Sequence, residues 1–314
     1  MNFHKRVDHL AIPTIRNDPF QWPRPCLSSG KTQLLGVFGD PIAHSLSPVI
    51  HNLALSHLDL DYHYLPFHVT PEHLPQAVHG FRILGGKGFN ATVPHKEALV
   101  ALMDDLSDAA IRTGAVNTVS CQDRLIGHNT DGHGFLAALR DMRPDFPQGG
   151  KALILGAGGA ARSVLSALLT TSIEAIFLAN RTEERAQALA RFFAPHDTQR
   201  RIQPMALVVD QLPWREITLL VNTTSLGLKG ETTLPVALHR LPADAFVYDI
   251  VYGPQGTPLT RLAQRHGLQT MDGMGMLVHQ AAAAFHLWTQ HEMPIAIIKD
   301  HLRQRANADR QKAD

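Results

Sequence analysis

The chain has 314 residues, of which 44% are hydrophobic and 18% are charged, with a formal net charge of +1. This length is enough for two domains with cores of their own, and the near-zero charge gives no sign of binding to nucleic acid or to an anionic membrane surface. No apolar run is long enough to span a bilayer, and the N-terminal residues lack the apolar core of a signal peptide. The sequence therefore favours a cytoplasmic protein.

Neither the cysteines nor the histidines are spaced as metal ligands. Cys26 and Cys121 form no CxxC or CxxH pattern, and the 19 histidines scatter along the chain without an HExxH motif. Structural zinc sites and metalloproteases depend on such spacings. We therefore expect no metal site.

The first 31 residues contain several prolines and no clear periodicity, so we expect residues 1–31 to form an extension. From Leu34 onward, short apolar segments alternate with amphipathic ones, which is typical of a parallel or mixed α/β sheet. The expected strands are 34–39, 62–69 and 88–93, and the expected helices are 47–58, 72–85 and 95–110. A β-rich segment at 115–130 predicts a hairpin that ends this first lobe.

A second alternating series follows a helix at 134–142 and a Pro/Gly-rich break at 143–150. Its expected strands are 151–156, 175–181, 219–224 and 245–252, and its expected helices are 160–170, 183–194 and 257–267. The last pattern, 276–290, is apolar around much of a helix, so we expect it to pack deep against the first lobe. Two α/β units predict two lobes with a ligand cleft between them.

A glycine-rich motif lies between the first strand and the first helix of the second series. Gly156, Gly158 and Ala161 fit the G-x-G-x-x-G/A pattern of dinucleotide-binding loops. The first glycine permits the tight turn, the second lets a pyrophosphate approach the backbone, and the small third residue lets the helix pack on the sheet. The sequence therefore predicts a dinucleotide site.

The end of the next strand indicates which dinucleotide is bound. A protein that binds NAD usually carries an acid there for the ribose 2′-hydroxyl, whereas this chain has Asn180, Arg181, Thr182 and, one turn later, Arg185. Two guanidinium groups can bind a 2′-phosphate. The alternative is that both arginines are solvated and pair with the neighbouring glutamates. We favour phosphate binding, and hence NADP.

Hydroxyl and charged side chains gather in the loops of the first lobe. Ser45 and Ser47 precede Pro48, a typical helix start with Ser47 as N-cap, and a helix N-terminus ringed with hydroxyls is also a good carboxylate site. Lys96 would lie in the first turn of a helix, where the dipole disfavours a positive charge. We expect Asp131, which opens the helix leading into the second lobe, to pair with Lys96 and take part in proton transfer.

Together these motifs resemble the shikimate dehydrogenase family. They are GDPIAHSLSPVIHN, GFNATVPHK, GAVNT, NTDG, GAGGAARS, NRTEER, VNTTSLG, VYGPQGTPL and DGMGMLVHQAAAAF, in order from about Leu34 to Trp288. One departure is Ala91, where we expect valine. The resemblance implies reversible, NADPH-dependent reduction of 3-dehydroshikimate to shikimate, in the route to aromatic amino acids.

The resemblance also implies roles for individual residues. Lys96 and Asp131 would be catalytic, with Lys96 as the acid/base. The substrate would be held by side chains from several loops, namely Ser45, Ser47, Thr92, Asn117, Tyr252 and Gln280. The cofactor would be bound by the glycine loop, the arginine segment and two backbone positions, namely Gly156, Ala157, Gly158, Gly159, Ala160, Asn180, Arg181, Thr182, Arg185, Ile250 and Gly273.

The implied architecture is an N-terminal α/β substrate-binding domain (32–131 plus 274–314) and a Rossmann-type, doubly wound NADP-binding domain (132–273). We expect a monomer or homodimer without nucleic-acid or membrane partners. Three alternatives stay open. They are a quinate/shikimate dehydrogenase, which would favour NAD, an aminoshikimate dehydrogenase, and a non-catalytic NADP-binding sensor.

Overall fold

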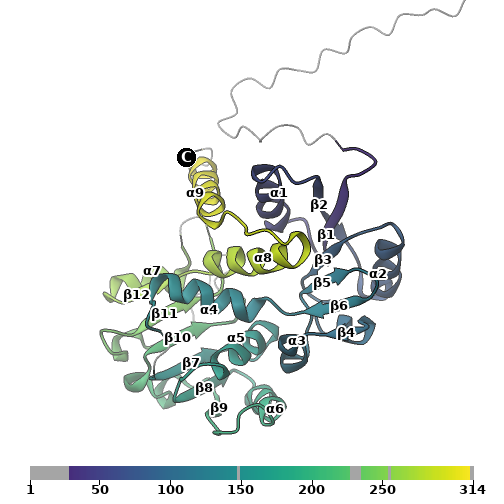
Figure 1. Cartoon of the computed structure of the whole chain (residues 1–314). Helices are drawn as coiled ribbons and strands as arrows, with labels where there is room; N and C mark the ends of the chain where they lie inside the picture. Colours follow the sequence, from purple (N-terminus) through teal and green to yellow (C-terminus); the bar gives the residue numbers. More distant parts are fainter. Residues whose placement is uncertain (1–27, 147–148, 227–234, 254–255, 312–314) are drawn as a thin grey trace, which may run out of the picture.

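The computed structural model of the chain describes residues 28–146, 149–226, 235–253 and 256–311. These residues form two α/β lobes that lie side by side, with two helices crossing between them (Figure 1). The predicted extension, residues 1–31, lies outside the described residues except for 28–31. The predicted two-lobed α/β fold is confirmed, whereas the exact domain boundaries stay a prediction.

The first lobe is built on a six-stranded mixed sheet with the strand order β2-β1-β3-β5-β6-β4. Its strands are β1 (Gln33–Gly39), β2 (Tyr62–His68), β3 (Gly88–Ala91), β4 (Asp105–Leu106), β5 (Thr118–Cys121) and β6 (Leu125–His128). The pairs β3–β5 and β5–β6 are antiparallel, as expected for the hairpin at 115–130. One face of the sheet packs on α1 (Ser47–His57) and the other on α2 (Leu74–Ile83).

The second lobe is built on a six-stranded sheet with the order β12-β11-β10-β7-β8-β9, in which every pair is parallel. Its strands are β7 (Lys151–Leu155), β8 (Ala175–Asn180), β9 (Ile202–Ala206), β10 (Leu219–Asn222), β11 (Phe246–Asp249) and β12 (Gln269–Met271). Its helices include α5 (Gly159–Leu169), α6 (Glu183–Phe193) and α7 (Pro258–Arg265). The order of the strands reverses between β7 and β10, which is where doubly wound sheets bind ligands.

Two helices join the lobes. α4 (Asp131–Met142) begins at the first sheet and packs along the second, and α8 (Met274–Thr289) packs against α4 (Figure 1). A Cβ atom at Gly134 would lie 2.7 Å from the backbone N of Gln280, so only glycine allows this close approach. The C-terminal half of α8 packs into the core of the first lobe, where Trp288 Nε1 donates to Val119 O over 3.0 Å. The prediction that this helix packs deep is confirmed.

A final helix, α9 (Ile295–Gln311), contacts both the end of α4 and the N-terminal half of α8. Asp141 at the end of α4 accepts hydrogen bonds from His279 Nε2 of α8 over 2.7 Å and from Lys299 Nζ of α9 over 2.5 Å. Leu302 and Ile298 of α9 are buried in the core of the first lobe. The sequence analysis did not predict α9, because the last twenty residues matched no motif.

The predicted helix at 95–110 is wrong. This segment forms a short 3₁₀ helix, η2 (Ala98–Leu102), then β4 and then α3 (Asp108–Thr113), which Ser107 caps by accepting from Ala110 N. The helix fails because Asp104 pairs twice with Leu125 on the neighbouring strand, through Asp104 N to Leu125 O and Leu125 N to Asp104 Oδ2. Strand pairing therefore overrides the local helical pattern.

Two edge strands were also missed. β9 contains Pro204, which is tolerated because β9 is an edge strand, and β12 has only three residues. The remaining short helices are the 3₁₀ turns η1 (Pro71–His73), η3 (Val209–Gln211), η4 (Trp214–Glu216) and η5 (Leu238–Arg240).

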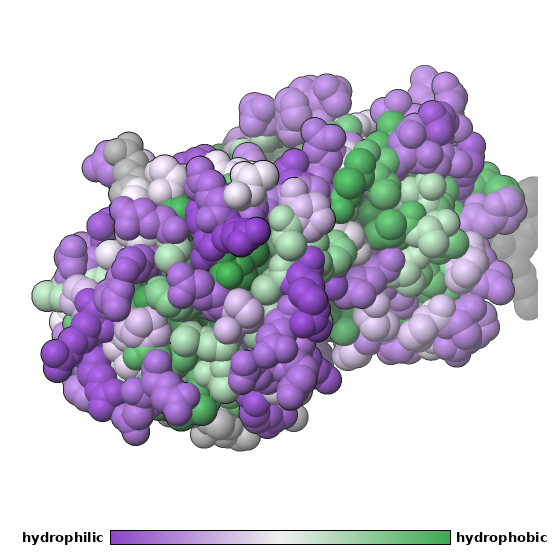
Figure 2. All heavy atoms as spheres, turned by 90° about the horizontal axis from the view of Figure 1, so that it is seen from below, coloured by the Kyte–Doolittle hydropathy of each residue, from purple (hydrophilic) through white to green (hydrophobic). Residues whose placement is uncertain are grey.

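On the face shown in Figure 2, hydrophilic side chains cover much of both lobes, and apolar side chains are visible in patches among them.

Candidate active site

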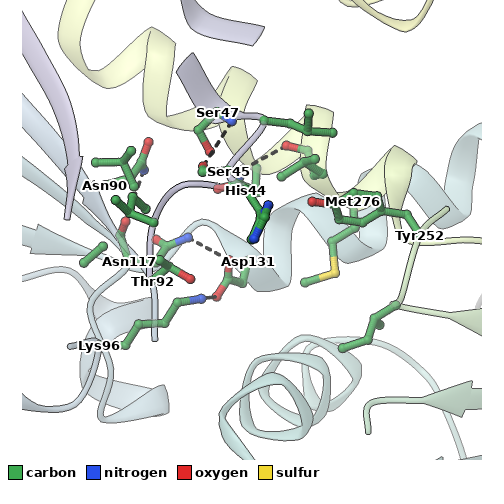
Figure 3. A pocket seen from close by; sticks show the side chains of 18 of the residues that line it. His44, Ser45, Ser47, Asn90, Thr92, Lys96, Asn117, Asp131, Tyr252 and Met276 are labelled. Carbon is green, nitrogen blue, oxygen red and sulfur yellow. Dashed lines mark hydrogen bonds and ion pairs between the residues drawn. The ribbon is translucent and has the colours of Figure 1, made fainter. Parts of the chain in front are cut away.

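A cavity of about 440 Å³ opens between the lobes, and residues of both lobes line it (Figure 3). It contains both predicted catalytic residues, all six predicted substrate ligands and the two backbone positions predicted for the cofactor. These are Lys96, Asp131, Ser45, Ser47, Thr92, Asn117, Tyr252, Gln280, Ile250 and Gly273. Segments up to 235 residues apart in the sequence (Ser45 to Gln280) therefore meet at one place, where a small polar molecule can bind.

Lys96 and Asp131 form an ion pair in this cavity. The distance from Lys96 Nζ to Asp131 Oδ2 is 2.6 Å, and 30% and 10% of the two side chains are exposed. Lys96 lies in a turn after β3 and not in the first turn of a helix, so the predicted conflict with a helix dipole does not arise. Instead, the carboxylate stands at the N-terminus of α4, where the dipole favours a negative charge.

The other oxygen of the carboxylate is held by Asn117. Asn117 Nδ2 donates to Asp131 Oδ1 over 2.7 Å, while Thr130 N donates to Asn117 Oδ1 over 2.8 Å. Asn117 is 2% exposed and Asp131 is 7% exposed. The carboxylate is therefore fixed on both oxygens, and the ammonium of Lys96 keeps donors free for a ligand in the cavity.

The two serines lie together at the start of α1. Ser47 N donates to Ser45 Oγ over 3.3 Å, so Ser45 closes the turn before the helix. The predicted cap was placed one residue late, because Leu46 is the N-cap residue and Ser47 is the first helical residue. Asn52, one turn into α1, bonds to the backbone N and O of Tyr64 on β2. Both serine side chains line the cavity, where a carboxylate fits.

The second lobe closes the cavity with the loop after β11 and the start of α8. A Cβ atom at Gly273 would lie 1.9 Å from Ile250 O, so the two backbones are in direct contact. Burial raises the pKa of Tyr252, so its hydroxyl is a hydrogen-bonding group and not an anion at neutral pH. Gln280 Nε2 donates to Leu277 O within α8, which leaves its carbonyl oxygen as an acceptor for a ligand.

The glycine loop follows β7 at the point where the order of the strands reverses. Gly156 has a φ of +106°, and a Cβ atom there would lie 2.8 Å from Thr223 Oγ1, so the tight turn requires glycine. Gly158 is the N-cap residue of α5, which begins at Gly159, and no atom lies within 4 Å of the Cβ position of either glycine. This leaves open space and free backbone N–H groups at a helix N-terminus, which fits a dinucleotide pyrophosphate.

The arginine segment lies between β8 and α6. Asn180 Nδ2 donates to Thr182 O over 2.8 Å and shapes the turn, and the side chains of Arg181 and Arg185 are exposed. Among the described residues, neither guanidinium group forms an ion pair, so the alternative of pairing with the neighbouring glutamates is not seen. Both arginines are free to bind a phosphate beside the glycine loop.

Models of one family match three parts of the chain. Residues 37–119 match the substrate-binding domain of shikimate dehydrogenase, residues 142–218 match shikimate/quinate 5-dehydrogenase, and residues 273–303 match the C-terminal domain of shikimate 5′-dehydrogenase. The chain is also 48% identical over 278 residues to shikimate dehydrogenase (NADP⁺) of Magnetococcus marinus, which covers 88% of this chain and 97% of that protein. The chain belongs to the shikimate dehydrogenase family.

Solved structures of the shikimate dehydrogenase family share this fold. Shikimate 5-dehydrogenase of Thermus thermophilus in complex with NADP(H) and shikimate is 38% identical, with a TM-score of 0.75 over 87% of this chain and 99% of that chain. Shikimate 5-dehydrogenase of Listeria monocytogenes in complex with shikimate and NAD is 38% identical, with a TM-score of 0.80 over 88% of this chain and 98% of that chain.

The sequence analysis missed several residues that line the cavity of this family member. They include His44, Asn90 and Met276, of which His44 points into the cavity in Figure 3. Asn90 carried a signal, because it is a polar residue in a strand that is otherwise apolar. His44 and Met276 carried none, since their neighbours come together only in the folded chain.

Neither a group of metal ligands nor a membrane-spanning helix is found among the described residues. Between residues 28 and 311, apart from the gaps given above, no three His, Cys, Asp or Glu side chains are grouped as metal ligands would be. Over the same part of the chain, no helix is both long and apolar enough to cross a membrane.

Proposed function

We propose that the chain catalyses the reversible, NADPH-dependent reduction of 3-dehydroshikimate to shikimate, a step in aromatic amino acid biosynthesis. The observation that carries the proposal is the Lys96–Asp131 pair, which lies in the cavity between the lobes beside hydroxyl and amide groups. The chain's membership of the shikimate dehydrogenase family supports the choice of substrate.

The arrangement gives each side of the substrate a partner. Ser45 and Ser47 at the start of α1 bind its carboxylate. Thr92, Asn117 and Gln280 surround the space for its hydroxyl groups, and Tyr252 closes the cavity from the second lobe. Lys96 is within reach of a carbonyl oxygen placed between these groups.

Lys96 acts as the general acid in the reduction. NADPH, when bound, supplies a hydride to the carbonyl carbon. The Lys96 ammonium donates a proton to the carbonyl oxygen, so that the C=O bond becomes CH–OH, and in reverse the neutral amine takes the proton of the alcohol. Asp131 holds the lysine side chain at the required position through the 2.6 Å ion pair.

The cofactor is bound by the second lobe. Gly156, Ala157, Gly158, Gly159 and Ala160 present the helix N-terminus of α5 to the pyrophosphate. Asn180, Arg181, Thr182 and Arg185 bind the 2′-phosphate, which gives NADP a preference over NAD. The backbone of Ile250 and Gly273 lines the same cavity and would hold the nicotinamide there.

The test is the rise in near-ultraviolet absorbance as purified protein reduces the cofactor. Shikimate and quinate are each tested with NADP and with NAD. We expect fast turnover only for shikimate with NADP. Turnover of quinate with NAD would assign the chain to the quinate/shikimate dehydrogenases instead. No turnover in any of the four reactions, with NADP still bound, would reject catalysis in favour of a sensor.

Two finer expectations accompany the proposed function. A cytoplasmic location stays a prediction, which cell fractionation tests. A monomeric or homodimeric state also stays a prediction, which light scattering of the purified protein tests.

A further inference from the structure

A continuous chain of hydrogen bonds leads from the catalytic carboxylate to the buried Tyr64 on β2, an edge strand of the first sheet. Asn117 Nδ2 donates to Asp131 Oδ1 over 2.7 Å, and Thr118 Oγ1 donates to Asn117 Oδ1 over 3.0 Å. Asn90 Nδ2 donates to Thr118 Oγ1 over 2.9 Å, and Tyr64 OH donates to Asn90 Oδ1 over 2.7 Å. The four bonds run from the start of β5 over β3 to β2 along one face of the sheet, so the chain begins at the cavity wall, which Asn117 and Asn90 line, and ends at a residue outside it.

The two ends of this chain require the same orientation of the amides between them. A carboxylate can only accept hydrogen bonds, so Asn117 must turn its NH₂ group toward Asp131. The backbone Asn117 O, which can only accept, takes a hydrogen bond from Asn90 Nδ2 over 3.1 Å, so Asn90 turns its NH₂ group toward β5. Its carbonyl oxygen then faces Tyr64, whose hydroxyl donates to it. All four donors therefore point toward the carboxylate.

The members of the chain are buried, so these bonds form in a low-dielectric interior where each is stronger than in water. Tyr64 and Thr118 are 0% exposed, Asn117 is 2% exposed and Asn90 is 5% exposed. Tyr64 is fully covered and is not among the residues that line the cavity, so it does not touch a ligand there. Any effect of its hydroxyl on the reaction must pass through its neighbours.

The ring of Tyr64 packs against two other aromatic side chains. The imidazole of His51 stacks on it with centroids 4.2 Å apart and an interplanar angle of 6°, and the indole of Trp288 lies 6.0 Å away. Asn52 of α1 bonds to the backbone N and O of Tyr64. The hydroxyl is thus fixed by packing of α1 and α8, and it can hold Asn90 in a single orientation.

We propose that Tyr64 is a positioning residue for the reductase reaction: through Asn90, Thr118 and Asn117 it holds the Asp131 carboxylate, and with it Lys96, at the place where the proton is transferred. This inference rests on the proposed function. It assigns a role to Tyr64 and Thr118, neither of which contributes to the cavity wall. Loss of one bond in the chain lets the Asp131 side chain and the paired Lys96 move from the proton-transfer position.

The first test is Tyr64→Phe, which removes one hydroxyl and keeps the stacked ring. We expect kcat to fall on the order of tenfold, which is less than the roughly 10²-fold loss when a catalytic group is misplaced by a full 1 Å. KM for shikimate and KM for NADP should stay within about twofold of wild type, since Tyr64 touches neither. The matched control is Tyr62→Phe, because Tyr62 lies two residues earlier on β2 and its hydroxyl is outside the chain. We expect Tyr62→Phe to retain the wild-type kcat.

A second test separates positioning from stability. Thr118→Val has nearly the shape of threonine and removes the hydroxyl, so it should also lower kcat on the order of tenfold, whereas Thr118→Ser restores the hydroxyl and should recover most of the wild-type kcat. A merely structural role would lower the melting temperature of the variants without this recovery.

The outcomes distinguish the two proposals. The positioning role alone is overturned if the wild type is active and kcat is unchanged in Tyr64→Phe. It is also overturned if the wild type is active and Thr118→Val and Thr118→Ser have equal kcat values. A wild type that turns over neither shikimate nor quinate overturns the proposed function and the positioning role with it.

Discussion

The buried imidazole of His51 predicts a defined loss of stability in mild acid. His51 is 0% exposed, neither ring nitrogen has a hydrogen-bond partner in the described structure, and burial lowers the pKa of the imidazole from 6.5 to about 3. Below pH 6.5 the unfolded chain binds a proton at this residue, but the native protein does not until about pH 3. The free energy of unfolding therefore falls as the pH falls through this window.

The size of the loss follows from the two pKa values. At pH 7.5 the imidazole is neutral in both states, so His51 contributes almost nothing. At pH 5 the imidazole is charged in the unfolded chain, because this pH is about 1.5 units below its pKa there. At 1.36 kcal/mol per unit, the free energy of unfolding is lower by about 2 kcal/mol than at pH 7.5. That is a large share of the 5–15 kcal/mol by which folded proteins are typically stable.

The test compares urea unfolding of wild type and His51→Phe at pH 7.5, 6 and 5. Phenylalanine keeps a ring against Tyr64 and cannot titrate. We expect the free energy of unfolding of the variant, relative to wild type, to rise by about 2 kcal/mol between pH 7.5 and pH 5. The control is His79→Gln at an exposed histidine, and its free energy of unfolding should change with pH as that of wild type does. If His51→Phe also runs parallel to wild type, the imidazole is protonated in the native state and the reasoning is wrong.

Three further predictions concern charged side chains. In Lys96→Ala, kcat should fall on the order of 10²-fold or more, while NADPH still binds, as measured by nucleotide fluorescence. Near-normal turnover would remove Lys96 from the mechanism. The control is Lys87→Ala, since Lys87 is exposed. Arg181→Ala should raise KM for NADPH and narrow the preference over NADH in steady-state kinetics, and an unchanged preference would reject phosphate binding. Burial acts to raise the pKa of Asp141, but hydrogen bonds from Lys299 and its histidine neighbour outweigh it, and the net pKa is lowered. The resulting stabilisation is present above about pH 4 and is lost as the pH falls below it. Asp141→Asn should therefore be less stable than wild type at pH 7, by only up to about 1 kcal/mol because the pair is half exposed. Thermal unfolding at pH 3.5 should show a smaller difference between the two proteins, and a difference that persists there would contradict the assignment.

Sequence patterns predicted the elements whose signals are local. The alternation of strands and helices and the glycine loop at Gly156 depend on neighbours in the chain, and both are found where expected. The helix expected at 95–110 failed because Asp104 pairs with a strand that begins at Leu125, and nothing in the segment itself encodes that partner. β9 failed for a related reason, since its proline reads as a break until its place at the edge of the sheet is known.

The candidate site divides in the same way. Lys96, Asp131 and the two serines were found from motifs, and the cavity brings them together. His44 and Tyr64 were not singled out. The importance of Tyr64 depends on bonds across three strands, and a single buried tyrosine in a strand looks like an ordinary core residue in the sequence.

The position of α8 has a consequence for how the protein is made. The core around β1 and α1 is completed by side chains of α8 and α9, including Phe285 and Leu302, which leave the ribosome after the whole second lobe. The first lobe therefore cannot complete this core during synthesis until α9 has been translated. The second lobe can fold earlier, since its sheet is built from one uninterrupted segment. We expect the newly made chain to depend on chaperones until α9 has emerged, and a truncation near residue 273 to leave the first lobe unfolded beside a folded second one.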